Sequence, residues 1–309
     1  MKVIITGGTG DIGRYLIKEL SQHGHQLVIL TRSPDKYRGS FEEAVELVQW
    51  DSKTAAGWVA HTDGADAIIN FAGENLAGET FLPDRWTKEK KLKIVRSRLQ
   101  VGKAVVEAVM AAGQKPKVVL QASAVGYYGP RNDDTLLDED TPPGDDFLGR
   151  TSVEWEQSTS AVKEMGVRQV ILRTGLVLMT ESGSLQRLIV QFKLFGGGCF
   201  GNARQWWPWI HIQDEVKAIR FLLESSDADG PYNLTAPNPV TNKTFTNVLG
   251  RVLRRPAFMP IPGFAMKLLV GEVATVVLDG QRAIPKRLQE TGYEFEYIDL
   301  EPALENLVK

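Results

Sequence analysis

"KVIITGGTGDIGRYLIKEL", residues 2–20, is the stretch of sequence that decides the fold. An apolar run, a glycine-rich turn and an amphipathic helix follow one another in it, in the order that a dinucleotide-binding site requires. Gly7, Gly10 and Gly13 have the spacing GxxGxxG, and Gly8 with Gly10 and Gly13 also satisfies GxGxxG. Glycines here permit a tight turn, let the backbone approach a pyrophosphate and let the helix pack close to the strand. The free amides and positive dipole of the helix N-terminus favour an anion at this turn.

The predicted cofactor site extends from this turn to the ends of three further apolar runs. After these runs come Arg32 in "TRS", Asp51 in "QWD" and Asn70 in "NFAG". We expect Asp51 beside an adenine, and small residues after Asn70 to let the backbone approach the cofactor. The predicted cofactor-binding residues are Thr6, Gly7, Gly8, Thr9, Gly10, Asp11, Ile12, Gly13, Thr31, Arg32, Ser33, Asp51, Asn70, Phe71, Ala72 and Gly73.

Arg32 indicates which dinucleotide is bound. It lies 19 residues after Gly13, where an NAD enzyme usually offers Asp or Glu to the ribose 2′-hydroxyl. A guanidinium there would contact a 2′-phosphate with two parallel hydrogen bonds. The sequence therefore predicts NADP(H) as the cofactor, and an ordinary surface arginine after a strand is the alternative.

Composition excludes several classes of protein. The 309 residues are 43% hydrophobic and 24% charged, as in ordinary globular proteins. Lys and Arg number 36 against 38 Asp and Glu, a formal charge of −2, so we expect no nucleic-acid partner. The lone Cys199 favours a reducing compartment, and we expect a cytoplasmic protein. No apolar run approaches the length of a membrane span, so we expect no membrane partner.

The order of apolar and helical segments predicts a doubly wound parallel α/β sheet, a Rossmann fold. Short apolar runs alternate with helical patterns as far as residue 178, including a long helix from Arg85 to Ala112 and one run from Gln169 to Leu178. Residues 1–178 are the predicted dinucleotide-binding domain, which 206–235 rejoin. Residues 179–309 are the predicted smaller, mainly helical C-terminal domain on the substrate side.

Motifs along the whole chain resemble the extended, epimerase/dehydratase branch of the short-chain dehydrogenase/reductase superfamily. They are "TGGTGDIG", "NFAGEN", "SAVGYYG", "ILRTGLVL", "WIHIQD" and "GPYNLTAP", in the order usual in that branch. The closing segments "VLRRPAFMPIP", "GEVATVVLDGQRAIPKRL" and "TGYEFEY" are similar to a subgroup of uncharacterised epimerase-like proteins with its own C-terminal domain. The resemblance implies hydride transfer between a nicotinamide and a small carbonyl, alcohol or nucleotide-sugar-like substrate. Homodimers are frequent in the superfamily, so a homodimer is an open expectation.

The reaction centre departs from the superfamily's pattern. There, a Ser or Thr at the end of the fifth strand works with a Tyr-x-x-x-Lys pair on the next helix, in which the ammonium lowers the tyrosine pKa. Ser123 matches the serine, but Phe147 and Thr151 occupy the Tyr and Lys positions. Phenylalanine has no proton to give and threonine has no positive charge, so we expect the usual proton relay to be absent.

Ser123, Tyr127 and Tyr128 are therefore the predicted catalytic residues. Ser123 would hold a substrate oxygen. The tyrosines would transfer the substrate proton, bind substrate passively or pack as half-buried aromatics, and the sequence leaves these alternatives open. Tyr127 and Arg131 repeat the Tyr-x-x-x-cation spacing, but Pro130 interrupts it.

Other polar groups are given structural roles. Asp214 is expected to cap or charge the first turn of a helix, and His211 to be a structural histidine. The acidic loop of residues 131–146 lacks the glycine and the terminal glutamate of a calcium loop, so we expect a solvated lid and no metal site.

Two functional hypotheses follow. The leading one is an atypical NADP(H)-dependent oxidoreductase or epimerase-like enzyme, because the cofactor site is intact. The alternative is a non-catalytic, NADP(H)-responsive binding or regulatory protein, because the relay is lost.

Overall fold

The structure is a computed structural model that describes residues 1–41, 45–78, 83–131 and 133–308. Its strands are β1 (Lys2–Thr6), β2 (Gln26–Thr31), β3 (Val45–Gln49), β4 (Ala67–Asn70), β5 (Val118–Ala124), β6 (Arg168–Thr174), β7 (Leu176–Leu178), β8 (Trp206–Trp207), β9 (Trp209–His211), β10 (Gly230–Leu234) and β11 (Val240–Thr241). Its α-helices are α1 (Asp11–Gln22), α2 (Val59–Thr62), α3 (Lys88–Ala111), α4 (Phe147–Gln157), α5 (Gly183–Lys193), α6 (Ile212–Glu224), α7 (Asn242–Leu253), α8 (Gly263–Val270), α9 (Thr275–Leu278), α10 (Lys286–Glu290) and α11 (Leu300–Val308). Short 3₁₀ helices are η1 (Pro34–Tyr37), η2 (Val125–Tyr128), η3 (Ser160–Met165) and η4 (Gly271–Ala274).

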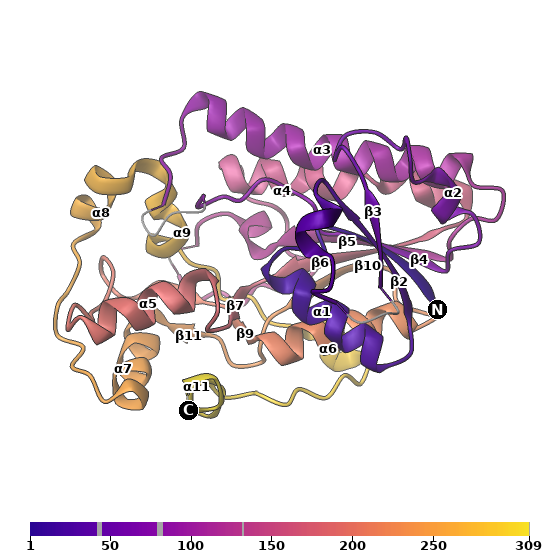
Figure 1. The fold of residues 1–309 in the computed structure, drawn as a ribbon. Coiled ribbons are helices and arrows are strands. Elements are labelled where there is room, and N and C mark those ends of the chain that lie inside the picture. Colours follow the sequence, from indigo (N-terminus) through magenta and orange to yellow (C-terminus); the bar gives the residue numbers. More distant parts are fainter. Residues whose placement is uncertain (42–44, 79–82, 132, 309) are drawn as a thin grey trace.

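Seven strands form one parallel sheet in the order β10-β6-β5-β4-β1-β2-β3. Helices α3 and α4 cover one face, and α1 and α6 cover the other (Figure 1). The strand order reverses between β1 and β4, which is where α/β sheets of this kind bind their ligands. The predicted doubly wound Rossmann fold is confirmed.

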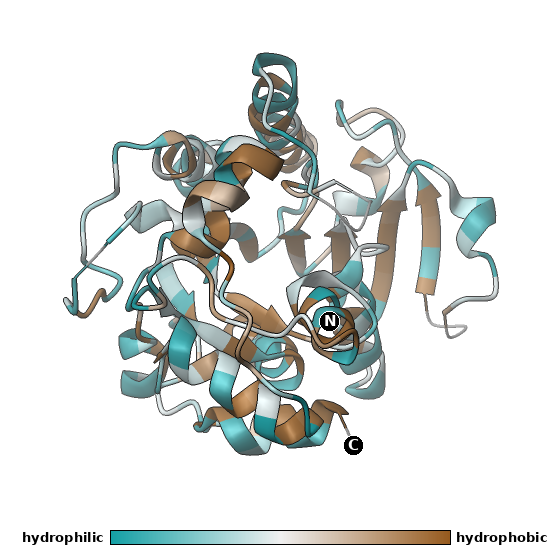
Figure 2. Cartoon of the chain, turned by 90° about the vertical axis from the view of Figure 1, so that its left-hand side faces the viewer, coloured by the Kyte–Doolittle hydropathy of each residue, from teal (hydrophilic) through white to brown (hydrophobic). Residues whose placement is uncertain are grey.

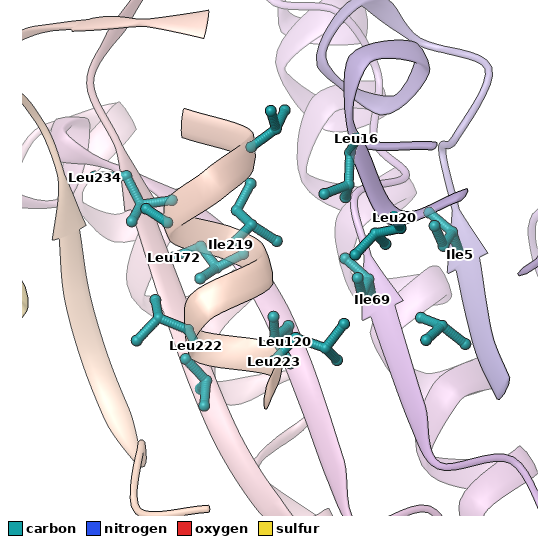
Figure 3. Close-up of a cluster of buried hydrophobic side chains, with 14 of the residues drawn as sticks. Ile5, Leu16, Leu20, Ile69, Leu120, Leu172, Ile219, Leu222, Leu223 and Leu234 are labelled. Carbon is teal, nitrogen blue, oxygen red and sulfur yellow. The ribbon is translucent and has the colours of Figure 1, made fainter. Parts of the chain in front are cut away.

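Both faces of the sheet are apolar, which explains the continuous hydrophobic runs of its strands. Ile4 packs with the α3 side, whereas its neighbour Ile5 packs with α1 and α6. Figure 3 shows Leu16 and Leu20 of α1 over the same sheet face as the leucines of α6. Because neighbouring residues of a strand face opposite sides, strands covered on both faces lack the polar alternation of a solvent-exposed sheet.

The apolar run predicted from Gln169 to Leu178 is two strands, not one. β6 ends at Thr174 in the main sheet, and β7 pairs with β9 in a separate two-stranded sheet. Gly175 lies between them, and a Cβ there would come within 2.2 Å of the Pro208 carbonyl oxygen. The break therefore depends on a close backbone approach, which periodicity does not reveal.

The long helix predicted from Arg85 begins instead at Lys88. The side chain of Thr87 caps it by accepting a hydrogen bond from the Lys90 amide. Arg85 instead extends to the other lobe and donates to the carbonyl oxygens of Leu268 and Leu269, at the end of α8.

The C-terminal lobe has a core of its own, built from α5, α7, α11 and the short strands. α6 and β10 belong to the main sheet layer, and β10 pairs with β6 at its edge. The exact division of the chain into domains at residue 178 stays a prediction. Within the described ranges, no helix is long and apolar enough to cross a membrane.

Candidate functional site

The glycine turn after β1 has the tight geometry that its spacing predicts. Gly7 has a φ of +71°, and a Cβ on it would lie 2.8 Å from the backbone nitrogen of Ala72. A Cβ on Gly13 would lie 2.6 Å from the Gly8 carbonyl oxygen. Gly7 is thus required where the turn meets the end of β4, and Gly13 where α1 packs on the turn.

Gly10 has a different environment. It is the N-cap of α1, its own φ is −75°, and no side chain caps the helix. A Cβ on Gly10 would meet a single neighbouring atom within 4 Å, the Gly7 carbonyl oxygen at 3.2 Å. Gly10 and Asp11 are exposed, while Thr9 and Ile12 are half-exposed. The first-turn amides of a twelve-residue helix are therefore open to an anionic ligand, and the turn fits a pyrophosphate.

Thr6 and Asn70, both predicted to bind cofactor, have side chains that bind each other. The Thr6 hydroxyl donates to Asn70 Oδ1 at 2.6 Å and accepts from the Ala72 amide at 3.1 Å. Asn70 Nδ2 donates in turn to Gln121 Oε1 at 2.8 Å. All three side chains are buried and join the ends of β1 and β4 to the middle of β5. Their contribution is to fix the strand ends, which leaves the exposed backbone at Gly73 to face a ligand.

Arg32 lies at the end of β2 with its side chain exposed. In the part of the chain that the structure describes, it has no ion pair or side-chain hydrogen bond. It lines an open depression together with Gln49, Trp50 and Asp51. This is the environment that a guanidinium needs to receive a phosphate. Of the flanking residues, Thr31 is buried and Ser33 is exposed.

Asp51 holds the loop that follows β3. Its Oδ1 accepts hydrogen bonds from the amides of Lys53 at 2.8 Å and Thr54 at 2.9 Å. The hydrogen bond from the Thr54 backbone, above all, holds the pKa of Asp51 below its usual range. Asp51 therefore shapes the depression beside Arg32 while it remains ionised at neutral pH.

Ser123 is not directed at an open cleft. It is 4% exposed, and its hydroxyl donates to Glu156 Oε1 of α4 at 2.6 Å. Glu156 makes a two-pronged ion pair with Arg173 of β6, through Nε at 2.9 Å and Nη2 at 3.0 Å. The odd-numbered residues of β5 face the α3 and α4 layer, as Val119 does, which places Ser123 on this buried side. The role of Ser123 as the holder of a substrate oxygen stays a prediction.

Tyr128 is also part of this buried cluster. It is fully buried, and its hydroxyl donates to Asn233 Oδ1 at 2.7 Å and accepts from Arg173 Nη1 at 3.2 Å. Burial raises the pKa of Tyr128 to about 12. A phenol in this position remains protonated and joins η2 to β10.

Tyr127 is the half-exposed member of the predicted catalytic set. The Arg173 guanidinium carbon lies 3.5 Å from the centre of the Tyr127 ring, and the Tyr127 and Tyr128 rings meet edge to face at 5.3 Å. The structure thus brings Ser123, Tyr127 and Tyr128 around one buried arginine. Only Tyr127 of the three is open to solvent.

Phe147 and Thr151 lie one turn apart on α4. The Thr151 hydroxyl donates to the Phe147 carbonyl oxygen at 2.7 Å, and the Phe147 ring packs against Trp86 at 5.3 Å. These two positions carry neither a phenol nor an ammonium group.

Sequence reasoning missed Glu156, Arg173 and Glu139. An arginine is rarely buried in an apolar strand unless it has a charged partner. The lone arginine within "QVILRTGLVL" could therefore have indicated a buried ion pair. Glu139 lies in the acidic loop that the sequence predicts to be solvated, yet it is 4% exposed and accepts from the amides of Asn233 at 3.0 Å and Arg287 at 3.3 Å. The prediction of a wholly solvated lid is wrong, because this carboxylate is buried against backbone donors.

The polar start of α6 has structural roles, as expected, and Asp214 lies in its first turn as one of the two predicted alternatives has it. His211, rather than Asp214, is the N-cap, with Nδ1 accepting from the Gln213 amide at 3.1 Å. Asp214 is buried and accepts from the amides of Glu296 and Tyr297, each at 2.9 Å. It therefore binds the C-terminal segment to the main sheet layer.

Comparisons with known proteins agree with this architecture. Residues 3–235 match the model of the NAD dependent epimerase/dehydratase family, and residues 261–307 match a domain of unknown function, DUF1731. The epimerase family protein YfhF of Bacillus subtilis is 37% identical over 308 residues, which is 100% of this chain and 98% of that protein.

Solved structures with this fold include two epimerase-type proteins. The crystal structure of human epimerase family protein SDR39U1 with NADPH is 30% identical, with a TM-score of 0.87 over 99% of each chain. A nucleoside-diphosphate sugar epimerase from Corynebacterium glutamicum is 28% identical, with a TM-score of 0.78 over 100% of this chain and 58% of that one.

Proposed function

Because the chain belongs to the NAD-dependent epimerase/dehydratase family, we propose that it is an NADP(H)-dependent oxidoreductase or epimerase-like enzyme. Its substrate would be a small carbonyl compound, an alcohol or a nucleotide-sugar-like molecule. The observation that carries the proposal is the cradle at Gly10, where the uncapped start of α1 is open to a pyrophosphate. The human relative was crystallised with NADPH, which supports the same cofactor here.

The cofactor, when bound, supplies or accepts the hydride. The residues of this chain bind and orient it. Gly7 lets the turn approach the end of β4, Gly13 lets α1 pack on the turn, and the amides of α1 would hold the pyrophosphate. Arg32 would hold the 2′-phosphate, and the Gly73 backbone would contact the cofactor beyond the pyrophosphate.

Proton transfer must differ from that of the superfamily, since Phe147 and Thr151 replace the usual relay. When a hydride adds to a carbonyl carbon, the carbonyl oxygen must gain a proton, and the accessible phenol of Tyr127 or a water molecule would be the donor. Tyr128 is fully buried and engaged by Asn233 and Arg173, so we assign it a positioning role. We assign Ser123 the same role, through Glu156.

The test combines binding with turnover. Purified protein is titrated with NADPH and NADH, and NADPH consumption is followed over a panel of carbonyl compounds and nucleotide sugars. We expect tight NADPH binding and measurable turnover that Tyr127→Phe lowers while NADPH affinity is unchanged. Absent NADPH binding would overturn the proposed cofactor site. Binding without turnover across the panel would favour the second function below.

The second candidate is a non-catalytic protein that responds to NADP(H). The observation in its favour is that the Ser123 hydroxyl is committed to a buried ion pair while Phe147 and Thr151 lack the relay chemistry. This function predicts that NADPH and NADP⁺ change the affinity for a protein partner. Affinity capture with and without each nucleotide tests it, and a partner set insensitive to both would contradict it.

A further inference from the structure

The C-terminal lobe carries large apolar side chains on its outside. Helix α8 exposes Phe264 and Leu268, which are 78% and 76% exposed. They lie four residues apart and therefore on one face of the helix. The opposite side of α8 packs inward through Met266 and Val270. Figure 2 views the molecule from this side, with strongly hydrophobic helix turns toward the viewer.

Neighbouring segments extend this exposed area. The chain after Arg255 runs beside the chain after Phe195, with the Met259 amide donating to the Gly197 carbonyl at 3.0 Å and the Ile261 amide donating to Cys199 at 2.8 Å. Both segments expose apolar side chains. We call the combined area the apolar surface, and it consists of Leu194, Phe195, Phe258, Met259, Phe264 and Leu268.

Four of the six residues of the apolar surface, Phe258, Met259, Phe264 and Leu268, lie in a segment of the chain whose charged side chains are all basic. Residues 230–271 contain no Asp or Glu, in a protein whose net charge is −2. The same 42 residues contain five basic side chains, Lys243, Arg251, Arg254, Arg255 and Lys267. Such a local excess of positive charge favours an anionic partner.

Three of these arginines line one open depression, next to the apolar surface. Arg251 pairs with Glu301 at 2.9 Å. Within the described ranges, neither Arg254 nor Arg255 has a salt bridge to a carboxylate. Arg255 lies over the Phe195 ring, 5.0 Å from its centre, so that positive and apolar groups adjoin.

The geometry points to a membrane containing anionic phospholipid as the occupant of the apolar surface. Exposed Phe and Leu side chains beside unpaired arginines are the chemistry of helices that lie in a lipid interface. Phe264 and Leu268 would enter the acyl region, while Arg254 and Arg255 would contact lipid phosphates. α8 lies at the outer edge of the molecule (Figure 1), so it meets a flat, fluid surface without needing a shaped pocket.

Charge argues against a second copy of the chain on the same surface. A two-fold contact would bring this basic region against itself, because each copy presents the same patch. The proposal departs from the sequence prediction of no membrane partner, which was drawn from the lack of a spanning segment, because interfacial binding needs no such segment. The inference does not depend on the proposed enzymatic function.

The experiment is vesicle flotation with the full-length protein. Vesicles of phosphatidylcholine alone are compared with vesicles that also contain phosphatidylglycerol, at low and at high salt. We expect binding to the anionic vesicles that weakens as salt rises. The double variant Phe264→Ser/Leu268→Ser should lose about tenfold or more in vesicle affinity, and Arg254→Glu/Arg255→Glu should lose a similar factor.

Met110→Ser is the matched control, because Met110 is 65% exposed on α3, away from this lobe. It should bind vesicles as the unaltered protein does. Circular dichroism and thermal melting show whether each variant is folded. Absent binding to both kinds of vesicle, or an equal loss in Met110→Ser, would overturn the proposal. A stable dimer in light scattering that Phe264→Ser/Leu268→Ser dissociates would overturn it in favour of a second copy.

Discussion

The Ser123 hydroxyl donates to Glu156 across 2.6 Å, inside the sheet layer and out of reach of solvent. Glu156 in turn holds Arg173, on whose guanidinium the half-exposed Tyr127 rests. Ser123, near the end of β5, thus helps to position Tyr127 through Glu156 and Arg173. This relationship distinguishes a positioning role from a catalytic one, and the two roles predict different mutant behaviour.

Ser123→Ala is expected to act on stability. A hydrogen bond to a buried charged group contributes about 1.5–3 kcal/mol, so we expect the free energy of unfolding to fall by about that amount in urea titrations. NADPH affinity should be unchanged, since Ser123 does not line the glycine turn. The exposed Ser226→Ala is the control and should change neither quantity. Unaltered stability together with lost turnover would instead make Ser123 catalytic.

Arg32→Asp is expected to change cofactor choice. Loss of a guanidinium that meets a phosphate, and its replacement by a carboxylate, should weaken NADPH by about a hundredfold and NADH by far less. Titration calorimetry with both nucleotides measures this. Arg38→Asp is a suitable control, because Arg38 is exposed and pairs with Asp35 at 2.7 Å. Equal weakening of the two nucleotides would show that Arg32 does not contact the 2′-phosphate.

Gly10→Ala and Gly13→Ala are expected to separate binding from folding. A methyl group on Gly13 meets backbone at 2.6 Å, so we expect a lower melting temperature and a loss of about 2 kcal/mol or more. A methyl group on Gly10 is tolerated by its φ of −75° but enters the anion cradle. Gly10→Ala should therefore melt close to the unaltered protein and bind NADPH about tenfold more weakly. A melting temperature lowered equally by both changes would contradict this separation.

Glu215 makes stability depend on pH. This buried carboxyl accepts from the Thr174 hydroxyl at 2.8 Å, and burial raises its pKa to about 8. The folded protein therefore binds a proton that the unfolded chain has already lost above the ordinary pKa of 4.5. It follows that this group lowers stability progressively as pH rises from the unfolded pKa through the folded one.

Glu215→Gln removes this titration and keeps the size of the side chain. We expect the variant to gain stability relative to the unaltered protein as pH rises from about 5 to 8. Urea titrations at several pH values measure the free energy of unfolding of both proteins. Because His211 and the other titrating groups are present in both, their contributions cancel in the difference. A difference that does not vary with pH would mean that Glu215 has an ordinary pKa in the folded protein.

Much of the fold was predictable because its signals are local. Glycine spacing and apolar periodicity predict the strand, turn and helix of residues 2–20. The distance of Arg32 from Gly13 predicts its place in the cofactor site. The break at Gly175 was not predictable, since it depends on the Pro208 carbonyl arriving from a segment more than thirty residues away. Local pattern carries no information on such a contact.

The reaction centre was predictable in position but not in orientation. Gln121 and Ser123 alternate with apolar residues, which places them on one face of the strand, but the sequence does not show which layer of helices covers that face. The answer depends on Glu156 and Arg173, which lie 33 and 50 residues further along the chain. Tyr127 and Tyr128 differ only in which neighbour buries them, and that too is a tertiary property.

The hydrogen bonds that Asp214 accepts from the amides of Glu296 and Tyr297 have a consequence for folding during synthesis. While the chain is still emerging from the ribosome, α6 can be present before its carboxylate has these two partners. An ionised group buried without them is costly, so the sheet layer should mature only after Tyr297 has been added. A chain cut before residue 293 should accordingly remain a substrate for chaperones and proteases, although all seven strands of the main sheet have been made.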